Sequence, residues 1–293
     1  MANVFVTGAS GFVGRKVCQR LADRGHQVTG LQRAPVAGAA SVRGDLLEPT
    51  TYESRLAGVD ILVHLAAVTG KADPREYTRV NVDGTRTVLA AARRAGVRRC
   101  LFFSSIAVAF PDTRRYFYAQ SKAAAERLVL ESGMAVTVIR PTIIAGPGSP
   151  VMSRLASLAA LPLVPAFGGA RAKVQPILVD DLADFVADVV DADRFRGEIL
   201  ELGGPEVLPL RDLLDRMHRR LRGRPAPFLY VPLGVPLAAL SVLERIAYGA
   251  VPITIGQLAT FRFDGVARPN DLWESRRGRL ASIDRILAAS AAA

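Results

Sequence analysis

The sequence contains few of the residues that build metal sites or disulfide frameworks. Its 293 residues include two cysteines and three histidines. Cys18 and Cys100 lie in apolar stretches, which is typical of small buried hydrophobic residues. His26, His64 and His218 are dispersed along the chain and form no metal-ligand motif. We therefore expect a metal-free protein without structural disulfides.

Lysine and aromatic residues are also scarce, whereas arginine is abundant. Lysine and arginine together number 38 against 27 acidic residues, which gives a net charge of +11. Such an excess can indicate a nucleic-acid partner. However, aromatic residues make up only 6% of the chain, no block of five or six like charges occurs, and the arginines are scattered in pairs. A nucleic-acid partner is therefore not expected.

No signal peptide is visible at the N-terminus, because a basic segment followed by an apolar one is missing. The uncharged stretch 225–243 approaches the length of a membrane span, but it contains four prolines, which disfavour a continuous helix. We expect a cytoplasmic protein. A helix over 236–249 would carry an apolar stripe that is either packed core or a peripheral membrane or protein contact through 225–263. The stripe consists of Leu237, Leu240, Leu243 and Ile246.

Short apolar runs alternate with helical patterns over the first 190 residues. This alternation predicts an α/β fold with a doubly wound parallel sheet, the Rossmann arrangement. The expected strands are 4–6, 28–31, 61–63, 101–103 and 136–139, and the expected helices are 12–24, 75–94, 117–131 and 182–191.

The pattern changes after about residue 150, where proline and glycine become frequent. We predict a dinucleotide-binding domain over 1–150 and a smaller C-terminal α/β lobe for substrate or interaction over 151–293, with helices near 210–222, 236–249 and 254–263. Within this second part, 176–203 is expected to return to the first domain, with a strand at 199–202.

A glycine-rich segment follows the first strand and opens the first helix. It reads Thr7-Gly8-Ala9-Ser10-Gly11-Phe12-Val13-Gly14. Gly8 permits a tight turn, Gly11 lets the backbone approach a pyrophosphate, and Gly14 allows the helix to pack closely on the strand. The phosphates then meet the free N–H groups at the helix N-terminus. The segment predicts a dinucleotide site.

The end of the second strand bears on which dinucleotide binds. A site for NAD usually has an acidic residue there, which binds the ribose hydroxyls. This chain has Gln32 followed by Arg33, and Arg15 lies directly after Gly14. Because guanidinium groups bind phosphate bidentately, this set favours NADP(H) over NAD(H).

A candidate catalytic pair lies on the helix predicted over 117–131. Tyr118 and Lys122 are four residues apart and share one helix face. The ammonium of Lys122 is expected to stabilise the phenolate and lower the Tyr118 pKa, so that Tyr118 acts as an acid or base on a carbonyl/alcohol pair. Two hydroxyls, Ser104 and Ser105, end the strand that precedes this helix.

With further motifs in the same order, the chain resembles the extended short-chain dehydrogenase/reductase family, also called the NAD-dependent epimerase/dehydratase family. These motifs are Asp45-Leu46, His64-Leu65-Ala66-Ala67, Asn81-Val82-Asp83-Gly84-Thr85 and Arg140-Pro141-Thr142-Ile143. The resemblance covers roughly the first 190 residues.

The resemblance implies a role for each matching position. Asp45 and Leu46 would contact the adenine, Leu65, Ala66 and Ala67 would line the cofactor, and Asn81 would order the central sheet. Pro141 and Ile143 would lie beside the nicotinamide. Ser105 would hydrogen-bond the reacting oxygen, Ser104 would line the cofactor, and Lys122 would reach the nicotinamide ribose. A homodimer through 75–94 and 117–131 is implied as well.

Two departures from the family pattern affect the reaction that we expect. Only thirteen positions separate Ser105 from Tyr118, and Ala109-Phe110 replaces the family's Tyr-Gly. The second half resembles an atypical subgroup that is similar to the nucleotide-binding accessory subunit of respiratory complex I. The leading interpretation is an NADP(H)-dependent oxidoreductase. The alternatives are a dinucleotide-binding structural or sensing protein without turnover, and a sugar-nucleotide epimerase or dehydratase.

The substrate is expected to be a small molecule and apolar. The stretch 145–175 is rich in apolar side chains and poor in polar anchors, although packed core would show the same composition. The residues concerned are Leu155, Leu158, Leu161, Val164 and Phe167. Asp181 has a structural interpretation, as the N-cap of a helix that begins at Leu182.

Overall fold

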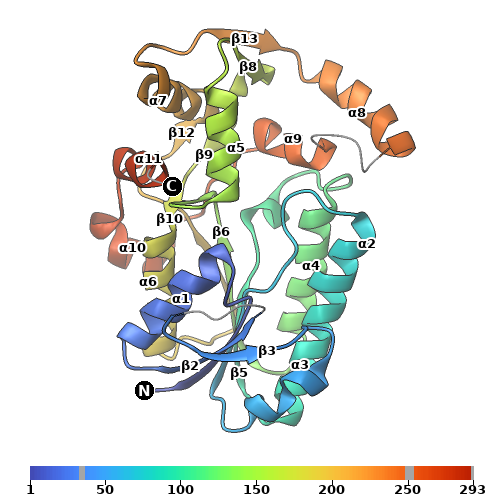
Figure 1. The fold of residues 1–293 in the computed structure, drawn as a ribbon, viewed down its shortest axis with the longest axis vertical. Coiled ribbons are helices and arrows are strands. Elements are labelled where there is room, and N and C mark those ends of the chain that lie inside the picture. Colours follow the sequence, from blue (N-terminus) through green and yellow to red (C-terminus); the bar gives the residue numbers. More distant parts are fainter. Residues whose placement is uncertain (33–36, 248–253, 292–293) are drawn as a thin grey trace.

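A computed structural model describes residues 1–32, 37–247 and 254–291 of the chain (Figure 1). Its main sheet has seven strands, all parallel, in the order β11-β6-β5-β4-β1-β2-β3. The predicted doubly wound α/β fold is thereby confirmed. The strands are β1 (Asn3–Thr7), β2 (Gln27–Gln32), β3 (Ala40–Arg43), β4 (Ile61–His64), β5 (Arg99–Phe103), β6 (Ala135–Pro141) and β11 (Glu198–Leu202).

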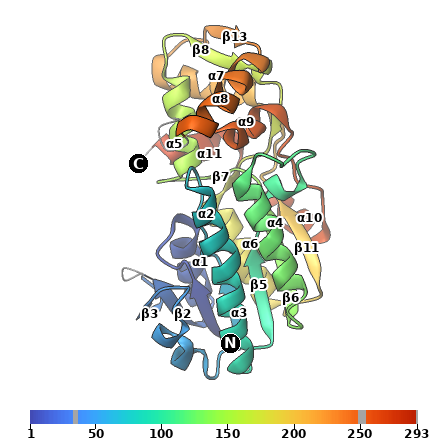
Figure 2. The same ribbon diagram turned by 90° about the vertical axis from the view of Figure 1, so that its right-hand side faces the viewer.

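Helices cover both faces of this sheet, as Figures 1 and 2 show. On one face, α1 (Phe12–Asp23) and α6 (Val179–Asp191) bury Leu21 and Phe185 against β1 and β4. On the other face, α3 (Gly84–Arg94) and α4 (Phe117–Leu130) bury Val88 and Val129 against the same strands. Burial on both sides explains why the strands are nearly continuous apolar runs.

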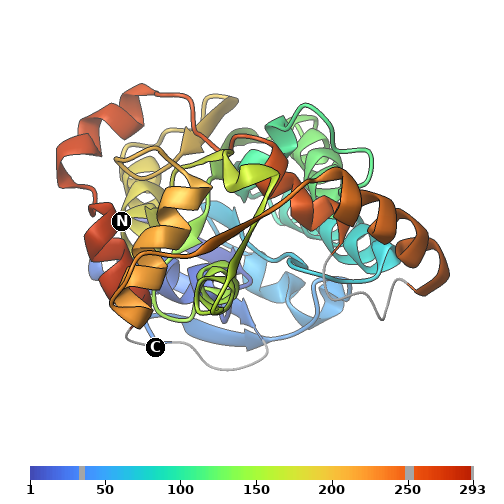
Figure 3. The same ribbon diagram turned by 90° about the horizontal axis from the view of Figure 1, so that it is seen from above.

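A second group of elements stands above the carboxyl ends of the strands (Figures 1 and 3). Its helices pack around a separate apolar core that includes Met152, Leu213 and Leu258. Its elements are β7 (Ile144–Ala145), α5 (Pro150–Ala159), β8 (Val164–Phe167), β9 (Lys173–Val174), β10 (Ile177–Leu178), β12 (Leu208–Pro209), α7 (Leu210–Arg222), β13 (Phe228–Val231), α8 (Gly234–Ala247), α9 (Ile255–Arg262) and α11 (Ile283–Ala291).

The helix predicted over 75–94 is divided in the structure. A short α2 (Pro74–Glu76) leads into a π-helical segment over Tyr77–Asp83, and α3 follows. The sequence pattern did not indicate this change, because a single π-helical turn alters the apolar spacing over only a few residues. It matters for function, since the π-helical segment contains Tyr77 and Asn81.

The N-cap role expected for Asp181 is wrong. Helix α6 begins at Val179, and Leu178 occupies the N-cap position, so Asp181 lies inside the first turn. Its carboxylate instead accepts a hydrogen bond of 2.9 Å from the backbone N–H of Ala281. That bond ties the last part of the chain to the main sheet. Nearby, α10 (Asp271–Arg276) buries Trp273 in the core of the α1 and α6 face.

The apolar stripe of the predicted helix 236–249 is only partly packed. Leu240 is 6% exposed and belongs to the upper core, whereas Leu243 is 48% exposed. The side chain of Ile246 and residues 248 and 249 lie outside the described part of the chain. Among the helices that the structure describes, none is both long and apolar enough to cross a membrane.

Candidate active site

The glycine-rich segment forms a tight turn between β1 and α1. Gly8 has a φ of +72°, and a Cβ there would lie 2.7 Å from the backbone nitrogen of Ala66. A Cβ on Gly14 would overlap the carbonyl oxygen of Gly8. Gly11 is the N-cap of α1 and has no side chain that could cap the helix. The N–H groups of Phe12 and Val13 at the helix start therefore have no side-chain acceptor from the N-cap residue. This geometry suits a pyrophosphate.

The glycine-rich turn and the loop after β4 form two walls of the predicted dinucleotide site, which we call the dinucleotide bed. Leu65, Ala66 and Ala67 are partly exposed and follow His64, at the edge of the sheet where Gly8 also lies. At the end of β6, Pro141 is buried and Ile143 is partly exposed. The structure thus brings residues from three motifs to the carboxyl edge of the sheet, where ligands of open α/β sheets bind.

The segment after β3 carries Asp45 and Leu46, the residues expected to contact the adenine. The Asp45 carboxylate is exposed and accepts a hydrogen bond of 2.9 Å from the backbone N–H of Leu47. Leu46 is buried and packs closely on Gly84. A Cβ on Gly84 would lie 2.6 Å from the Cδ2 atom of Leu46.

Gln32 is buried at the end of β2, and its amide donates a hydrogen bond to the Ser41 hydroxyl. Its Oε1 atom has no hydrogen-bond partner among the described residues. A ribose hydroxyl, which both dinucleotides carry, would satisfy that oxygen. Arg15 is exposed and donates a hydrogen bond of 3.3 Å to the carbonyl of Ser10, so its guanidinium lies over the glycine-rich turn. Arg33 lies outside the described residues.

Tyr118 and Ser105 meet although they come from different elements. Tyr118 lies in the first turn of α4, Ser105 follows β5, and the Ser105 side chain is close enough to influence the Tyr118 pKa. Ser105 also caps the short 3₁₀ turn after β5 by accepting a hydrogen bond of 3.2 Å from Ala107 N–H. Burial raises the pKa of Tyr118 to about 12, and the Ser105 side chain opposes this shift. The lowered Tyr118 pKa that we expected from Lys122 is not found, because burial is the largest effect on the phenol and Lys122 is not among the groups that shift its pKa.

Lys122 is buried one helical turn after Tyr118. Its Nζ atom lies 4.3 Å from the centre of the Phe102 ring. Burial lowers the Lys122 pKa to about 7, and the charge of Glu126 opposes that shift. The lysine can therefore gain or lose a proton near neutral pH.

Below Lys122, a buried network joins α4 to the end of the sheet. Ser104 donates a hydrogen bond of 2.6 Å to Glu126, so its hydroxyl points away from the glycine-rich turn. Arg140 donates to the same carboxylate at 2.5 and 3.1 Å, and a second carboxylate, Glu201, lies 3.5 Å from Arg140. Both carboxylates are buried. The network fixes the helix that carries Tyr118 and Lys122.

Asn81 connects the π-helical segment to two other parts of the site. Its amide accepts a hydrogen bond of 2.7 Å from Val68 N–H and donates to the Val68 carbonyl at 3.0 Å, and it also donates to the Ser121 hydroxyl at 2.9 Å. Asn81 therefore holds the loop after β4 against α4, rather than acting on the strands themselves. From the same segment, the Tyr77 ring packs 6.2 Å from that of Tyr118.

His64 forms a continuous hydrogen-bonded chain beneath the dinucleotide bed. The distance from Thr7 Oγ1 to His64 Nδ1 is 2.6 Å, and that from His64 Nε2 to Thr85 Oγ1 is 2.9 Å. Thr85 donates onward to the Asn81 carbonyl, and Ala66 N–H donates to Thr7. All four bonds are satisfied together when His64 is neutral and protonated on Nε2. Burial lowers its pKa to about 3, in agreement with a neutral ring.

The assembled site has the parts needed for acid–base chemistry on a carbonyl or an alcohol. A nicotinamide dinucleotide, when bound, gives or accepts a hydride. Ser105 and Tyr118 can both donate hydrogen bonds to a carbonyl oxygen, and Tyr118 can deliver or remove the proton there. Lys122, one turn away, supplies a positive charge behind the phenol.

Several residues of the site were not identified from the sequence. Tyr77 lies inside the unpredicted π-helical segment, and Arg140 was noted only as part of a motif. Glu126 could have been found from its spacing, because it lies four residues after Lys122 on the same helix face. The apolar residues expected to line the substrate pocket lie mainly in the core of the upper lobe, where Val164 is buried and Leu155, Leu158 and Phe167 pack against it. Leu161 is exposed.

Comparison with known proteins agrees with this geometry. The chain is 31% identical over 244 residues to the 2-alkyl-3-oxoalkanoate reductase of Stenotrophomonas maltophilia (strain K279a), a match that covers 73% of this chain and 74% of that protein. It is 38% identical over 167 residues to a 4-hydroxy-2-methyl-3-oxo-4-farnesyl-3,4-dihydroquinoline-1-oxide ketoreductase of Stigmatella aurantiaca, but spans only 50% of that relative's length.

Solved structures share the fold over the whole chain. The gox2253 crystal structure is 26% identical and superposes with a TM-score of 0.78, covering 100% of this chain and 97% of that one. MoeE5 in complex with UDP-glucuronic acid and NAD is 24% identical, with a TM-score of 0.71 over 98% of this chain and 97% of that one. Residues 4–203 match the NAD dependent epimerase/dehydratase family. The chain therefore belongs to this family of enzymes.

Proposed function

We propose that the protein is an NADP(H)-dependent oxidoreductase, which transfers a hydride between the nicotinamide and a carbonyl/alcohol substrate. The observation that carries the proposal is the placement of Ser105 directly after β5 beside Tyr118 in the first turn of α4, with the buried Lys122 one turn further along that helix. In this proposal Ser105 orients the substrate oxygen, Tyr118 exchanges its proton, and Lys122 supports the phenol and reaches the nicotinamide ribose.

Net oxidation or reduction is favoured over epimerisation for two reasons. Two relatives that match in sequence are named as a reductase and a ketoreductase. In addition, the loop between Ser105 and Tyr118 spans only thirteen positions, which leaves less chain for binding a sugar nucleotide. A sugar-nucleotide epimerase or dehydratase remains the second candidate, favoured by the shared fold with the NAD complex of MoeE5.

The preference for NADP(H) is supported by charge at the adenosine end of the bed. Gln32 is neutral where an acidic side chain would repel a 2′-phosphate, and Arg15 lies over the glycine-rich turn. The proposed cofactor contacts are those that the family resemblance implies for the matching motifs. Ser104 would contact the cofactor through its backbone, because its hydroxyl donates a hydrogen bond to Glu126.

A homodimer is also part of the proposal. Helices α3 and α4 lie side by side on one face of the sheet (Figure 2), and a twofold axis beside them would give an isologous interface. For 225–263, a peripheral membrane or protein contact is supported by the exposed apolar residues Leu229, Tyr230, Val235 and Leu243. Light scattering and vesicle sedimentation test these two points.

Turnover assays test the proposed function. The full chain is assayed with NADPH and with NADH against a panel of apolar ketones and oxo acids, following dinucleotide absorbance and product formation. We expect NADPH-dependent reduction that Tyr118→Phe reduces by at least about a hundredfold, since general acid–base catalysis contributes that much or more. Full turnover by Tyr118→Phe would overturn the role of this phenol. Tightly retained dinucleotide with isomerised sugar nucleotide and no net redox change would favour the epimerase.

A further inference from the structure

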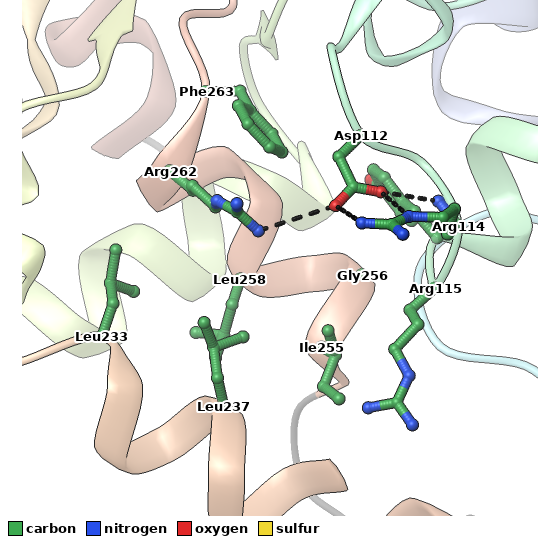
Figure 4. Close-up of a pocket in the computed structure, with 11 residues that line it drawn as sticks. Asp112, Arg114, Arg115, Leu233, Leu237, Ile255, Gly256, Leu258, Arg262 and Phe263 are labelled. Carbon is green, nitrogen blue, oxygen red and sulfur yellow. Dashed lines mark hydrogen bonds and ion pairs between the residues drawn. The ribbon is translucent and has the colours of Figure 1, made fainter.

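A pocket of about 440 Å³ lies beside the catalytic helix, between the loop 112–116 and the helices α8 and α9 (Figure 4). Its size lies within the usual range for small-molecule sites. The two sides of the pocket differ in chemistry, and this difference identifies the kind of ligand that fits.

One side of the pocket is hydrocarbon. Leu233 and Leu237 point into it from the beginning of α8, and Leu258 of α9 is buried in the upper core at this wall (Figure 4). Helix α9 comes very close to the loop at Gly256, where a Cβ would lie 2.6 Å from the Tyr116 ring. This close approach holds the apolar wall directly opposite the loop.

The other side of the pocket carries an excess of positive charge. Three arginines, Arg114, Arg115 and Arg262, line this side with a single carboxylate, Asp112, and only Arg114 and Arg262 pair with that carboxylate (Figure 4). Asp112 accepts two side-chain hydrogen bonds of 3.1 Å from Arg114 and lies 3.8 Å from Arg262. Arg115 has no ion-pair or hydrogen-bond partner in the described part of the chain, and its side chain extends along the pocket (Figure 4). It is therefore the guanidinium that an anionic ligand can engage without breaking an existing pair.

The pocket adjoins the catalytic phenol. Tyr116 lines the pocket, and its ring centre lies 5.9 Å from that of Tyr118. Tyr116 therefore lies both at the pocket and against the ring of the proposed acid–base group.

We propose that this pocket binds the substrate as a carboxylate-bearing amphiphile, with a hydrocarbon chain on Leu233 and Leu237 and a negative group at Arg115. The inference rests on the proposed function, in that it names the substrate class of the same site. The leucines supply the driving force for the chain, and the guanidinium selects an acid over an uncharged compound of equal length.

Calorimetry with two matched probes, decanoate and decan-1-ol, tests the pocket on the full-length protein. We expect decanoate to bind about tenfold more tightly than the alcohol, because one charge-assisted hydrogen bond contributes roughly that factor. Arg115→Gln removes the difference and leaves the affinity for decan-1-ol unchanged. Leu237→Asn weakens both probes. Arg127→Gln, which removes an exposed arginine of α4 outside the pocket, changes neither.

Equal affinities for the acid and the alcohol would overturn the proposal, as would equal effects of Arg115→Gln and Arg127→Gln. Tyr118→Phe separates the pocket from the reaction, because it should abolish turnover and leave decanoate affinity intact. If ketones are reduced but decanoate binds without regard to Arg115, the pocket assignment fails and the proposed function stands. If the affinity for decanoate depends on Arg115 but no hydride transfer occurs, the proposed ligand class stands and the proposed oxidoreductase function fails.

Discussion

Burial lowers the pKa of Lys122 to about 7, and Glu126, four residues further along α4, opposes that shift with its carboxylate. Glu126 is in turn held by hydrogen bonds from Ser104 and Arg140. The charge of Lys122 thus depends on a buried carboxylate whose position is set by the end of β6. This relationship makes Glu126 a positioning residue with a measurable effect on pH dependence.

Replacing Glu126 by glutamine should move the pH profile of the reaction. Without the carboxylate, the pKa of Lys122 falls further, so the ammonium is lost at lower pH. The alkaline limb of kcat/KM for carbonyl reduction should therefore shift by ~1 pH unit toward acid. The measurement is kcat/KM between pH 5.5 and 9.

The matched control is Glu201→Gln. Glu201 also faces Arg140, at 3.5 Å, but it contributes no charge effect on Lys122. This variant should lose some stability, because Arg140 keeps Glu126 but loses its second carboxylate partner, and it should keep the wild-type pH profile. If both variants shift the profile equally, Glu126 has no specific effect on the lysine.

His64 should make the protein sensitive to acid. The folded state holds the ring neutral with a pKa of about 3, whereas the unfolded chain takes up a proton below ~6.5. The neutral His64 ring therefore contributes to the free energy of unfolding in full above pH ~6.5. This contribution falls by ~1.4 kcal/mol per pH unit as the pH decreases from ~6.5 toward 3. Urea unfolding at pH 5.5 and 4.5 should show this slope, and His64→Asn should be shallower by that amount. Identical slopes would mean that His64 takes up no fewer protons when the protein is folded.

Gly14→Ala should disrupt the dinucleotide bed. The added Cβ overlaps the Gly8 carbonyl oxygen, so α1 must move away from the turn. We expect a loss of about 1–3 kcal/mol in unfolding free energy and the loss of thermal stabilisation by NADP⁺. Gly278→Ala is the control, because nothing lies within 4 Å of its Cβ position. A Gly14→Ala protein that NADP⁺ still stabilises fully would contradict the proposed role of this turn.

Gln32→Glu should change which dinucleotide binds. A carboxylate at this position accepts hydrogen bonds from ribose hydroxyls and repels a 2′-phosphate. The ratio of the Kd for NADP⁺ to that for NAD⁺ should rise by about tenfold or more. Gln32→Met removes the amide without adding charge and should change the ratio much less. Tighter binding of NAD⁺ than of NADP⁺ by the unmodified protein would overturn the NADP(H) assignment.

The parts of the fold that could be predicted are those set by local sequence. The apolar runs of β1 and β4 reflect burial on both faces of a parallel sheet, and Gly8 and Gly14 occupy positions where a Cβ does not fit. The pairs between distant segments could not be predicted. Nothing near Glu126 in sequence indicates Arg140 as its partner, and nothing near Tyr116 indicates that Gly256 packs against it. Helix α10 was missed because six residues are too few to show an apolar period.

The transfer of an isotopic label tests the central claim most directly. NADPH with deuterium at both C4 positions of the nicotinamide is incubated with a ketone substrate found in the panel, and the product is analysed by mass spectrometry. An oxidoreductase places one deuterium on the former carbonyl carbon for each NADPH consumed, and Tyr118→Phe should greatly slow this transfer. A product without deuterium, formed while the dinucleotide stays unchanged, would contradict the account.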